Sequence, residues 1–232
     1  MKSFVYENVD INVHDDVFYP TETSKIILDY LLKTDKSYAS VLDLGCGSGV
    51  VTTVLGKSGR GGQFSASDIC EKATANAAAN LKRHSIPADV RAGSLYEPWK
   101  DSRFDLVICD VSGVAEELAK ASGWFSDKVS CASGRDGTEL VSRIIAETPR
   151  HLAAGGTMIL PILTLSDHRK LLKTLKTHFS RVEKVASRQF YLPKDMEAHA
   201  PLVERLLSEG LIDVEKKFGL YLWKTELYEA AI

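Results

Sequence analysis

Residues 41–50 read VLDLGCGSGV, and this stretch decides the fold class. The apolar run 41–44 carries a single acid at Asp43 and is typical of a buried parallel strand. Three glycines follow at alternate positions. They favour a turn whose backbone can come very close to a ligand, because no Cβ stands in the way. The stretch therefore predicts a buried strand that ends in a ligand-binding turn.

The spacing of these glycines distinguishes between kinds of ligand. A strand, a glycine-rich turn and a helix form the first unit of a Rossmann-like sheet, and a dinucleotide-binding turn reads GxGxxG. Here Gly45, Gly47 and Gly49 give DxGxGxG together with Asp43. This pattern resembles motif I of the class I S-adenosylmethionine (SAM)-dependent methyltransferases, whose ligand has no phosphate. A NAD(P)-dependent oxidoreductase with a variant turn, or a turn without any ligand, is the competing interpretation.

Composition narrows the class of protein. The 232 residues can bury one sizeable core, and 29 basic against 31 acidic residues give no basic footprint for nucleic acid. The four cysteines form no CxxC pair, and the histidines show no ligand spacing, so no metal site is expected. No apolar segment approaches the ~20 residues that span a bilayer, so we expect a soluble cytoplasmic protein with no membrane contact.

Alternating strand and helix patterns predict the architecture. We expect an α/β fold with a Rossmann-like, seven-stranded, mostly parallel sheet, helices on both faces and an antiparallel last strand. Helices are expected over 22–33, 48–58, 70–84, 113–122, 138–152, 166–178 and 196–209, strands over 38–44, 61–68, 88–93, 104–110, 157–163, 181–190 and 218–227, and a small hairpin over 4–18.

The segment 192–213 connects the last two predicted strands. If those strands are antiparallel, their connection emerges at the carboxyl ends of the parallel strands, where ligands bind in such sheets. The segment is therefore predicted to lie beside the active site. It fits a lid or substrate wall and, equally, a surface helix that covers the sheet edge.

The ends of the next two strands supply further candidate cofactor ligands. Asp68 ends the second strand about 20 residues after Gly45, where an acid accepts hydrogen bonds from a ribose diol. It could also cap the next helix. Asp43 is expected to polarise the turn and to reach the ligand's ammonium. Ser94 is expected near the adenine amino group, with Leu95 or Ile69 packed on the ring, although Leu95 also fits an ordinary core position. Cys46, between the glycines, belongs to the same predicted site.

A wider resemblance covers residues 17–165. The stretch VFYPTETSKIIL (17–28) resembles the segment before the fold in the release-factor glutamine methyltransferases and the related small-domain methyltransferases, with Pro20, Glu22 and Ser24 on matching positions. SASDICEKATANAAAN, AGSLYEPWKDSRFDLVICD, SGRDGTELVSRII and HLAAGGTMIL are similar to later family segments, in the family's order. The resemblance implies that residues 1–34 form an extension that covers the cofactor, with Pro20 and Ser24 at its methionine end. It also implies that 35–232 form the methyltransferase domain.

The chain departs from this family after its fourth predicted strand. The family carries an NPPY motif there, which holds a planar NH2 group in line with the methyl group. Here the positions read Asp110, Val111, Ser112 and Gly113. Glutamine or adenine specificity is therefore not implied. Asp110 could act as a base, hold a cationic amine or cap the next helix, and Ser112 could orient a hydroxyl, so these two are the candidate catalytic residues.

Weaker candidates lie outside this group. Arg135 and Asp136 fit either a substrate-binding loop or a structural turn. Trp99 and Trp124 could line a pocket, although packing is the default for large aromatic residues. His199 lies in the segment 192–213.

We therefore expect a SAM-dependent methyltransferase that releases S-adenosyl-L-homocysteine. The acceptor would be an N or O atom of a protein side chain or a small metabolite. The alternatives are a non-catalytic SAM-binding module and, last because of the charge balance, a nucleic-acid base methyltransferase. The sequence leaves the acceptor and the oligomeric state open.

Overall fold

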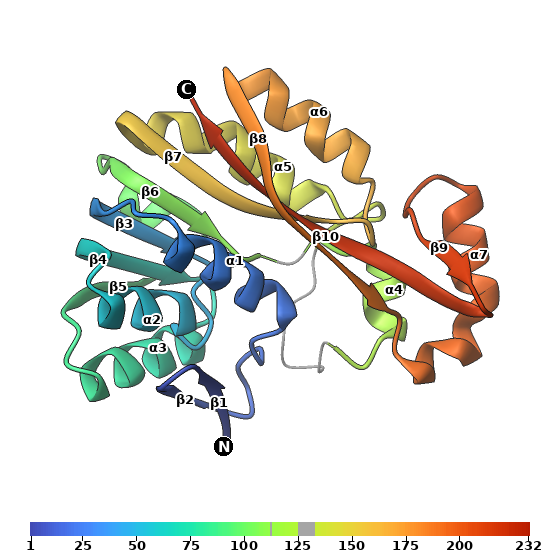
Figure 1. Ribbon diagram of the computed structural model, residues 1–232, viewed down its shortest axis with the longest axis horizontal. Coiled ribbons are helices and arrows are strands. Elements are labelled where there is room, and N and C mark those ends of the chain that lie inside the picture. Colours follow the sequence, from blue (N-terminus) through green and yellow to red (C-terminus); the bar gives the residue numbers. More distant parts are fainter. Residues whose placement is uncertain (112, 125–132) are drawn as a thin grey trace.

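A twisted central sheet forms the body of the protein. The computed structural model describes residues 1–111, 113–124 and 133–232. The sheet has the order β5-β4-β3-β6-β7-β10-β8, and β9 pairs with β10 beyond this path (Figure 1). Its strands are β3 (Tyr38–Leu44), β4 (Gly61–Asp68), β5 (Ala88–Ala92), β6 (Phe104–Cys109), β7 (Leu152–Leu163), β8 (Arg181–Tyr191), β9 (Glu215–Lys217) and β10 (Leu220–Ala231).

Strand directions agree with the sequence-based prediction. The β3–β4, β4–β5, β3–β6 and β6–β7 pairs are parallel, whereas β10 is antiparallel to both β7 and β8. β10 therefore lies between β7 and the edge strand β8. The short β9 is an addition that the sequence patterns did not predict.

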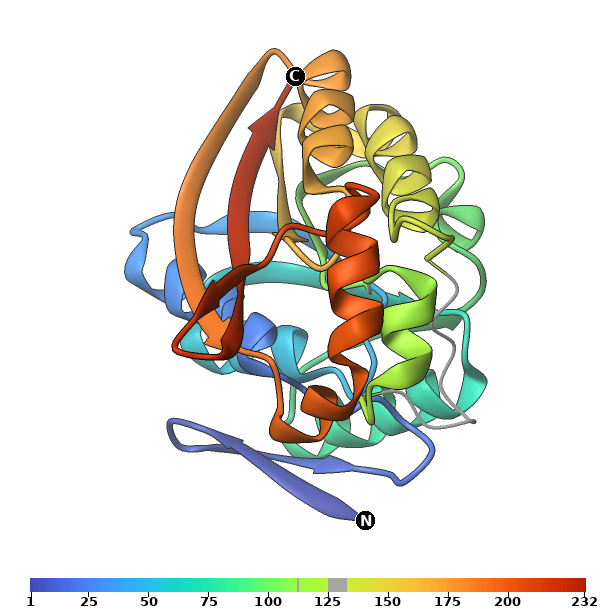
Figure 2. The same ribbon diagram turned by 90° about the vertical axis from the view of Figure 1, so that its right-hand side faces the viewer.

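Helices cover both faces of the sheet. One apolar core joins α1, α2 and α3 to one face, and a second joins α5 and α6 to the other (Figures 1 and 2). The helices are α1 (Glu22–Lys33), α2 (Val50–Ser58), α3 (Glu71–Arg83), α4 (Glu116–Ala121), α5 (Glu139–Glu147), α6 (His168–His178) and α7 (Ala200–Ser208), with 3-10 turns at Glu97–Trp99, Thr148–His151 and Lys194–His199. No helix in the described ranges is long and apolar enough to cross a bilayer.

Two predicted helices are shorter in the structure for a local reason. The helix predicted over 138–152 ends as an α-helix at Glu147, because Pro149 lies in the 3-10 turn that follows it. β7 then begins at Leu152, five residues earlier than predicted, and runs through Gly155 and Gly156 with a shift in its register against β6. The helix predicted over 196–209 begins with a 3-10 turn, and α7 starts at Ala200, just before Pro201.

The N-terminal hairpin, β1 (Lys2–Tyr6) and β2 (Val9–Val13), is held by amide side chains instead of a third strand. Asn76 and Asn80 of α3 are buried, and their side-chain oxygens accept hydrogen bonds from the His14 and Asn12 N–H groups at 3.0 Å each. The Asn80 Nδ2 also donates to the Ser48 carbonyl, inside the glycine-rich turn. Because these bonds satisfy the free edge of β2, the hairpin and the turn are fixed to the same helix.

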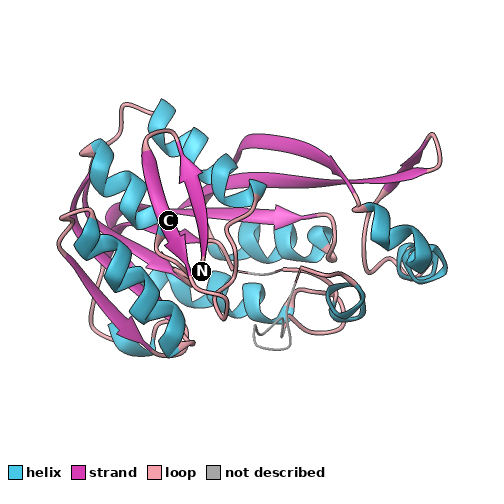
Figure 3. Ribbon diagram, turned by 90° about the horizontal axis from the view of Figure 1, so that it is seen from below, coloured by secondary structure: helices cyan, strands magenta, loops and turns pink. Residues whose placement is uncertain are grey.

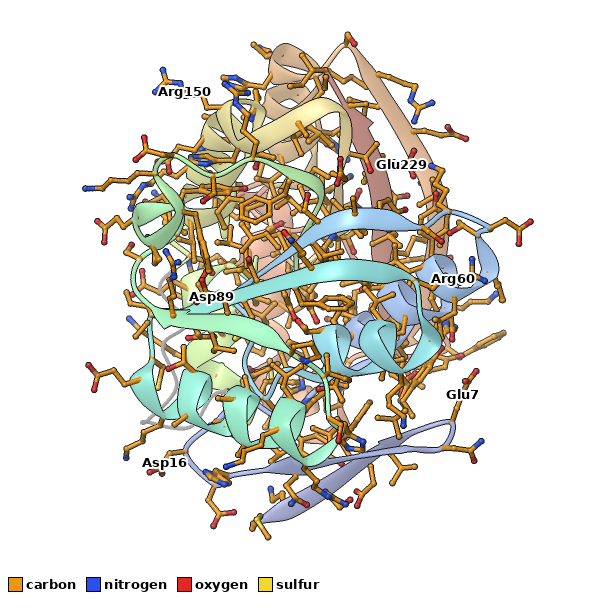
Figure 4. The ribbon with its side chains drawn as sticks, turned by 90° about the vertical axis from the view of Figure 1, so that its left-hand side faces the viewer. Glu7, Asp16, Arg60, Asp89, Arg150 and Glu229 are labelled. Atoms are coloured by element: carbon orange, nitrogen blue, oxygen red, sulfur yellow. The ribbon has the colours of Figure 1, made fainter. Side chains whose placement is uncertain are left out.

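A buried acid on β10 connects the region of α1 with the C-terminal strands. Glu229 is 2% exposed and accepts hydrogen bonds from Lys36 Nζ, Tyr30 Oη and Arg181 at 2.6–2.8 Å (Figure 4). These partners outweigh its burial and hold the Glu229 pKa below its usual value. The contacts fix α1, which carries part of the candidate site, against the C-terminal strands.

The segment 192–213 emerges at the carboxyl ends of the parallel strands, as predicted. Its buried residues, which include Leu192, Met196 and Val203, pack against Val114 and Leu118 at the start of α4 (Figure 2). An ion pair between Arg205 and Glu117 (2.5 Å) ties the same two elements together. The segment thus lies against the polypeptide that directly follows β6.

Candidate functional site

The glycine turn after β3 has one open side. Gly45, Gly47 and Gly49 have φ values of +77°, +52° and +75°, in the region that favours glycine. A Cβ on Gly45 would lie 2.6 Å from Val111 Cγ2, and one on Gly49 would lie 2.9 Å from Ala77 Cβ. A Cβ on Gly47 would meet no atom of the described residues within 4 Å. Gly45 and Gly49 thus allow close packing inside the protein, whereas Gly47 faces open space, where a ligand can approach the backbone.

Asp68 fixes this turn to the end of β4. Its Oδ2 accepts a hydrogen bond from the Gly47 N–H (3.0 Å), and its Oδ1 accepts one from the Cys70 N–H (2.9 Å). The second contact closes a local turn just before α3, but Asp68 is not the helix cap, because the N-cap residue of α3 is Cys70. The first holds Asp68 beside the open side of Gly47, so one carboxylate serves the fold and also borders the candidate ligand site.

The residues predicted near the adenine ring lie beside Asp68. The Gly93 N–H donates to the Asp68 carbonyl (3.0 Å), which brings the end of β5 to the same edge. Ile69 is 71% exposed, an unusual state for a large apolar side chain at a strand end. Leu95 has a φ of +49°, a strained conformation for a bulky residue. Ser94 is half-buried and its carbonyl accepts from the Glu97 N–H, which fixes this loop.

Asp43 is a buried acid beneath the turn. It is 1% exposed, and its Oδ2 accepts hydrogen bonds from the Thr52 hydroxyl (2.6 Å) and the Thr52 N–H (3.3 Å) on α2. Burial raises the pKa of Asp43 from 3.8 to about 6, and the negative charges of Asp110 and Asp68 add to the rise against the Thr52 hydrogen bonds. Three carboxylates therefore share one region, and among the described residues no cation contributes to the pKa of Asp43.

Because of this arrangement, the ionised Asp43 carboxylate destabilises the folded protein above neutral pH. The folded-state pKa of about 6 exceeds the usual 3.8, so the folded state holds the proton more tightly and loses stability as the pH rises from about 4 to about 6. The difference corresponds to about 3 kcal/mol. We expect Asp43→Asn to raise the unfolding free energy of the ligand-free protein by about 1–3 kcal/mol at pH 8, with a smaller gain at pH 5. Denaturant unfolding at both pH values measures this, and a loss of stability at pH 8 would contradict it.

Ser24 of α1 reaches across to Asp110 at the end of β6. The Ser24 hydroxyl donates to Asp110 Oδ2 at 2.5 Å, and Ser24 is 3% exposed. Burial raises the pKa of the Asp110 carboxyl, while the Ser24 hydrogen bond acts in the opposite direction. Pro20 is buried just before α1, and Thr21 caps the helix by accepting from the Thr23 N–H. The structure therefore brings Ser24, four residues after Pro20, to Asp110, which is 86 positions away in the sequence.

Of the remaining predicted site residues, Cys46 contributes only its backbone, and Ser112 cannot be placed. The Cys46 side chain packs in the protein with Ala66 and Ala77, so only its backbone borders the turn. Burial, with Asp43 and Asp68 nearby, raises the Cys46 pKa, which keeps the thiol neutral. Ser112 lies outside the described residues.

The weaker candidates have structural partners. Asp136 accepts from Thr138 (2.6 Å) and from Lys170 Nζ (2.7 Å), and these contacts hold its pKa below the usual value although burial acts against them. Arg135 pairs with Glu209 at 2.9 Å. Trp99 is buried and donates to Ser67 Oγ, which confirms ordinary packing.

The remaining two weak candidates belong to the region of α4 and 192–213. Trp124 stands 6.0 Å from Trp223, in the core that 192–213 shares with α4. His199 is exposed at the start of α7. In the described part of the chain, no three His, Cys, Asp or Glu residues gather as a metal site would require.

Sequence reasoning missed the contacts that position the site. Thr52, inside the helix predicted over 48–58, is the hydrogen-bond partner of Asp43, and the sequence patterns do not predict this contact. Val111 covers Gly45, and Thr23 Oγ1 lies 3.4 Å from Thr225 Oγ1 on β10. Neither contact has a local sequence signature.

The site fits a cationic ligand that carries a diol and an aromatic ring. Gly47 leaves space for close backbone approach, Asp68 offers a carboxylate beside it, and the exposed Ile69 offers an apolar surface. Asp43 and Asp110 supply negative charge that a cation would neutralise. SAM has these features, since it combines a ribose diol and an adenine ring with a sulfonium and an ammonium group.

Comparison with known proteins agrees with this fit. The family model of the methyltransferase small domain matches residues 10–111. The release factor glutamine methyltransferase of Geobacter sulfurreducens is 27% identical over 158 residues, which are 66% of this chain and 56% of that protein. The chain thus spans little more than half the length of such curated relatives.

Solved structures share the fold. The ribosomal protein L11 methylase of Lactobacillus delbrueckii subsp. bulgaricus superposes with a TM-score of 0.58 at 15% identity, covering 96% of this chain and 86% of that one. A 16S rRNA methyltransferase of T. thermophilus, in complex with AdoMet and guanosine, gives 0.60 at 12% identity, covering 100% and 50%. At these identities the likeness concerns the fold alone.

Proposed function

We propose that this chain, which belongs to the class I SAM-dependent methyltransferases related to the release factor glutamine methyltransferases, transfers a methyl group from SAM to an N or O atom of a protein side chain. A small metabolite is the second acceptor class. The observation that carries the proposal is the grouping of Asp43, Asp68 and Asp110 near the glycine turn, with Asp68 beside the open side of Gly47. Such a cluster of acids suits a cationic ligand.

In this proposal each cofactor contact has a separate task. The backbone from Gly45 through Cys46 to Gly49 borders the methionine part of SAM, and Asp43 attracts its ammonium group. Asp68 accepts hydrogen bonds from the ribose hydroxyls, Ser94 faces the adenine amino group, and Ile69 and Leu95 cover the ring. Pro20 and Ser24 close the methionine end from α1, a role that the hydrogen bond between Ser24 and Asp110 supports.

SAM, when bound, supplies an activated methyl on a good leaving group. The protein therefore mainly has to position the acceptor. Asp110 is the candidate to receive a proton or a hydrogen bond from the acceptor, because burial raises its pKa and makes its carboxylate a stronger base. Ser112 remains a proposed hydroxyl-orienting residue.

The acceptor class follows from what Asp110 can bind. A carboxylate only accepts hydrogen bonds, so Asp110 suits an amine, an ammonium or a hydroxyl. It offers no amide side chain for reading a planar NH2 group, and no proline follows it at 111–113. Relatives named as glutamine methyltransferases support a protein acceptor, while this difference argues against carrying over the glutamine itself.

Ligand binding and methyl transfer test the proposal directly. Thermal unfolding is measured with SAM, S-adenosyl-L-homocysteine or NADH at equal concentration. We expect stabilisation by the first two compounds and none by NADH, since only a ligand of the folded state raises the melting temperature. Stabilisation by NADH alone would overturn the proposal. Binding of S-adenosyl-L-homocysteine without methyl transfer to protein, metabolite or RNA fractions would favour the non-catalytic binding module.

We also propose that 192–213 acts as a lid or substrate wall. The packing of its apolar residues on α4, directly after Asp110, supports this proposal. Replacing 195–210 by a short Gly-Ser linker should lower methyl transfer about tenfold or more, because lids exclude water and hold the acceptor. Arg205→Ala, which removes the ion pairs with Glu117 and Glu209, is a milder variant that preserves the core. Unchanged turnover in both folded variants would leave 192–213 as a cover for the sheet edge.

A nucleic-acid base is the third candidate acceptor. The likeness to an rRNA methyltransferase concerns the fold, and the chain has nearly equal numbers of basic and acidic residues. Phosphate contacts dominate nucleic-acid affinity, so this candidate has the least support.

A further inference from the structure

The turn between β9 and β10 carries a residue that is unusual for a turn of its type. Lys217 pairs with Leu220, so Phe218 and Gly219 form a two-residue turn. Their φ values are +52° and +80°, the pattern of a type I′ turn. Such turns favour Asn-Gly, because the first position requires a left-handed backbone that bulky side chains resist. Phe218 is therefore an unfavourable residue for the turn that it occupies.

Packing does not compensate for this conformation. Phe218 is 90% exposed, and the nearest described cation, Lys217 Nζ, stands 5.7 Å from its ring. Tyr191 and Leu207, in the same C-terminal region, are 56% and 37% exposed. An isolated exposed apolar residue is ordinary. A strained and fully exposed aromatic residue at a turn is the kind of local inconsistency that function explains more readily than folding does.

The hairpin projects beyond the candidate site. Thr225 of β10 pairs with Leu163, the last residue of β7, and β10 continues outward from Thr225 to Leu220. At about 3.3 Å per residue, the turn lies roughly 17 Å past the carboxyl end of β7. Figures 1 and 3 show β9 and the first part of β10 extending away from the parallel strands, on the side where α4 and α7 lie. A small metabolite at Asp110 could not reach Phe218, whereas a macromolecule could contact both.

The charges around the turn favour a protein over a polyanion. Lys216 pairs with Glu204 at 2.7 Å, and Tyr221 donates to the same carboxylate. Glu215 offsets the charge of Lys217 on the three-residue strand β9. The tip therefore presents an apolar ring among balanced charges. Aromatic side chains of this kind anchor protein–protein interfaces, whereas nucleic-acid surfaces need an excess of cations.

We propose that Phe218 is a docking residue for a protein that carries the methyl-accepting side chain, inserted into an apolar pocket of that protein. This inference rests on the proposed methyl transfer and names its partner class. Docking at a distance from the chemistry would increase the local concentration of the acceptor at Asp110 and leave the chemical step unchanged.

The test uses Phe218→Asn, which removes the ring and gives the Asn-Gly pair that the turn favours. The full chain and [methyl-3H]SAM are incubated with nuclease-treated soluble protein from cells in which the gene is deleted, and separately with total RNA from those cells. We expect the initial rate of protein labelling at low acceptor concentration to fall about tenfold, as for an aromatic anchor. SAM affinity and the rate at saturating acceptor should be unchanged, and the melting temperature equal or higher. Phe218→Tyr, which retains the ring, should label at the wild-type rate.

Each other outcome is informative. Protein labelling at equal rates with wild type and Phe218→Asn would overturn the docking role and leave methyl transfer standing. Labelling of RNA alone would likewise overturn the protein partner while methyl transfer stands. No label in the protein or the RNA fraction would overturn a protein acceptor and, with it, this inference. Adding the small-metabolite fraction of the same cells then distinguishes a metabolite acceptor from a complete lack of methyl transfer.

Discussion

Asp68→Ala should weaken SAM binding by at least about 100-fold. The carboxylate lies beside the open side of Gly47 and is the proposed acceptor for the ribose hydroxyls. Hydrogen bonds to a charged group contribute about 1.5–3 kcal/mol each, so the loss of two such bonds corresponds to about 3 kcal/mol or more. Isothermal titration with SAM and with S-adenosyl-L-homocysteine measures this loss, which should be similar for both compounds because they share the ribose.

The structural role of Asp68 requires a control. Alanine also removes the contacts to the Gly47 and Cys70 N–H groups, which should cost about 1–2 kcal/mol of stability. Asp89→Ala removes an exposed acid of the neighbouring strand, whose contacts are with Arg91, and should leave cofactor binding unchanged. Binding by Asp68→Ala at the wild-type affinity would show that Asp68 only orders the glycine turn and the short turn before α3.

Much of the fold follows from local sequence patterns. The run VLDL and its glycines predict β3 and the turn, and the alternation of strands and helices predicts the parallel sheet. The carboxyl ends of parallel strands meet at one edge, so the neighbourhood of Asp43, Asp68 and Asp110 could be expected before any coordinates. These features depend on periodicity and spacing, which a single sequence contains.

The rest depends on tertiary contacts that no local pattern records. The bond between Ser24 and Asp110 joins residues on opposite sides of the glycine motif, and it forms only because Glu229 and the core hold α1 against the C-terminal strands. The positive φ values of Leu95 and Phe218 contradict their residue types. β9 is a three-residue strand in a charged segment, too short for an alternating pattern.

The three acids connect stability to binding. In the ligand-free protein, burial and mutual repulsion raise the pKa of Asp43. A cation in the site would relieve that repulsion. The free energy released in this way would add to the affinity for the ligand. At Asp110, burial raises the pKa against the opposing hydrogen bond from Ser24.

Asp110→Asn should reduce the rate of methyl transfer by about 100- to 10,000-fold, the usual contribution of a general base. Asparagine has nearly the same shape and can still accept the Ser24 hydrogen bond, so the fold should be kept. The loss of one of the three negative charges should weaken SAM binding, so methyl transfer is compared at saturating SAM. A base must be deprotonated to act. Because burial raises the Asp110 pKa, wild-type kcat/KM should fall as the pH decreases through that raised pKa, and the variant should lack this acidic limb.

Ser24→Ala separates this role from simple charge attraction. The Ser24 hydrogen bond stabilises the Asp110 carboxylate and lowers its pKa, so its removal should move the acidic limb to higher pH while most of the activity at high pH remains. If Asp110 only holds a cationic amine, Asp110→Asn should instead raise KM for the acceptor more than it lowers kcat. Wild-type kcat, KM and pH profile in Asp110→Asn would leave Asp110 with neither role, as an acid that only connects α1 to the end of β6.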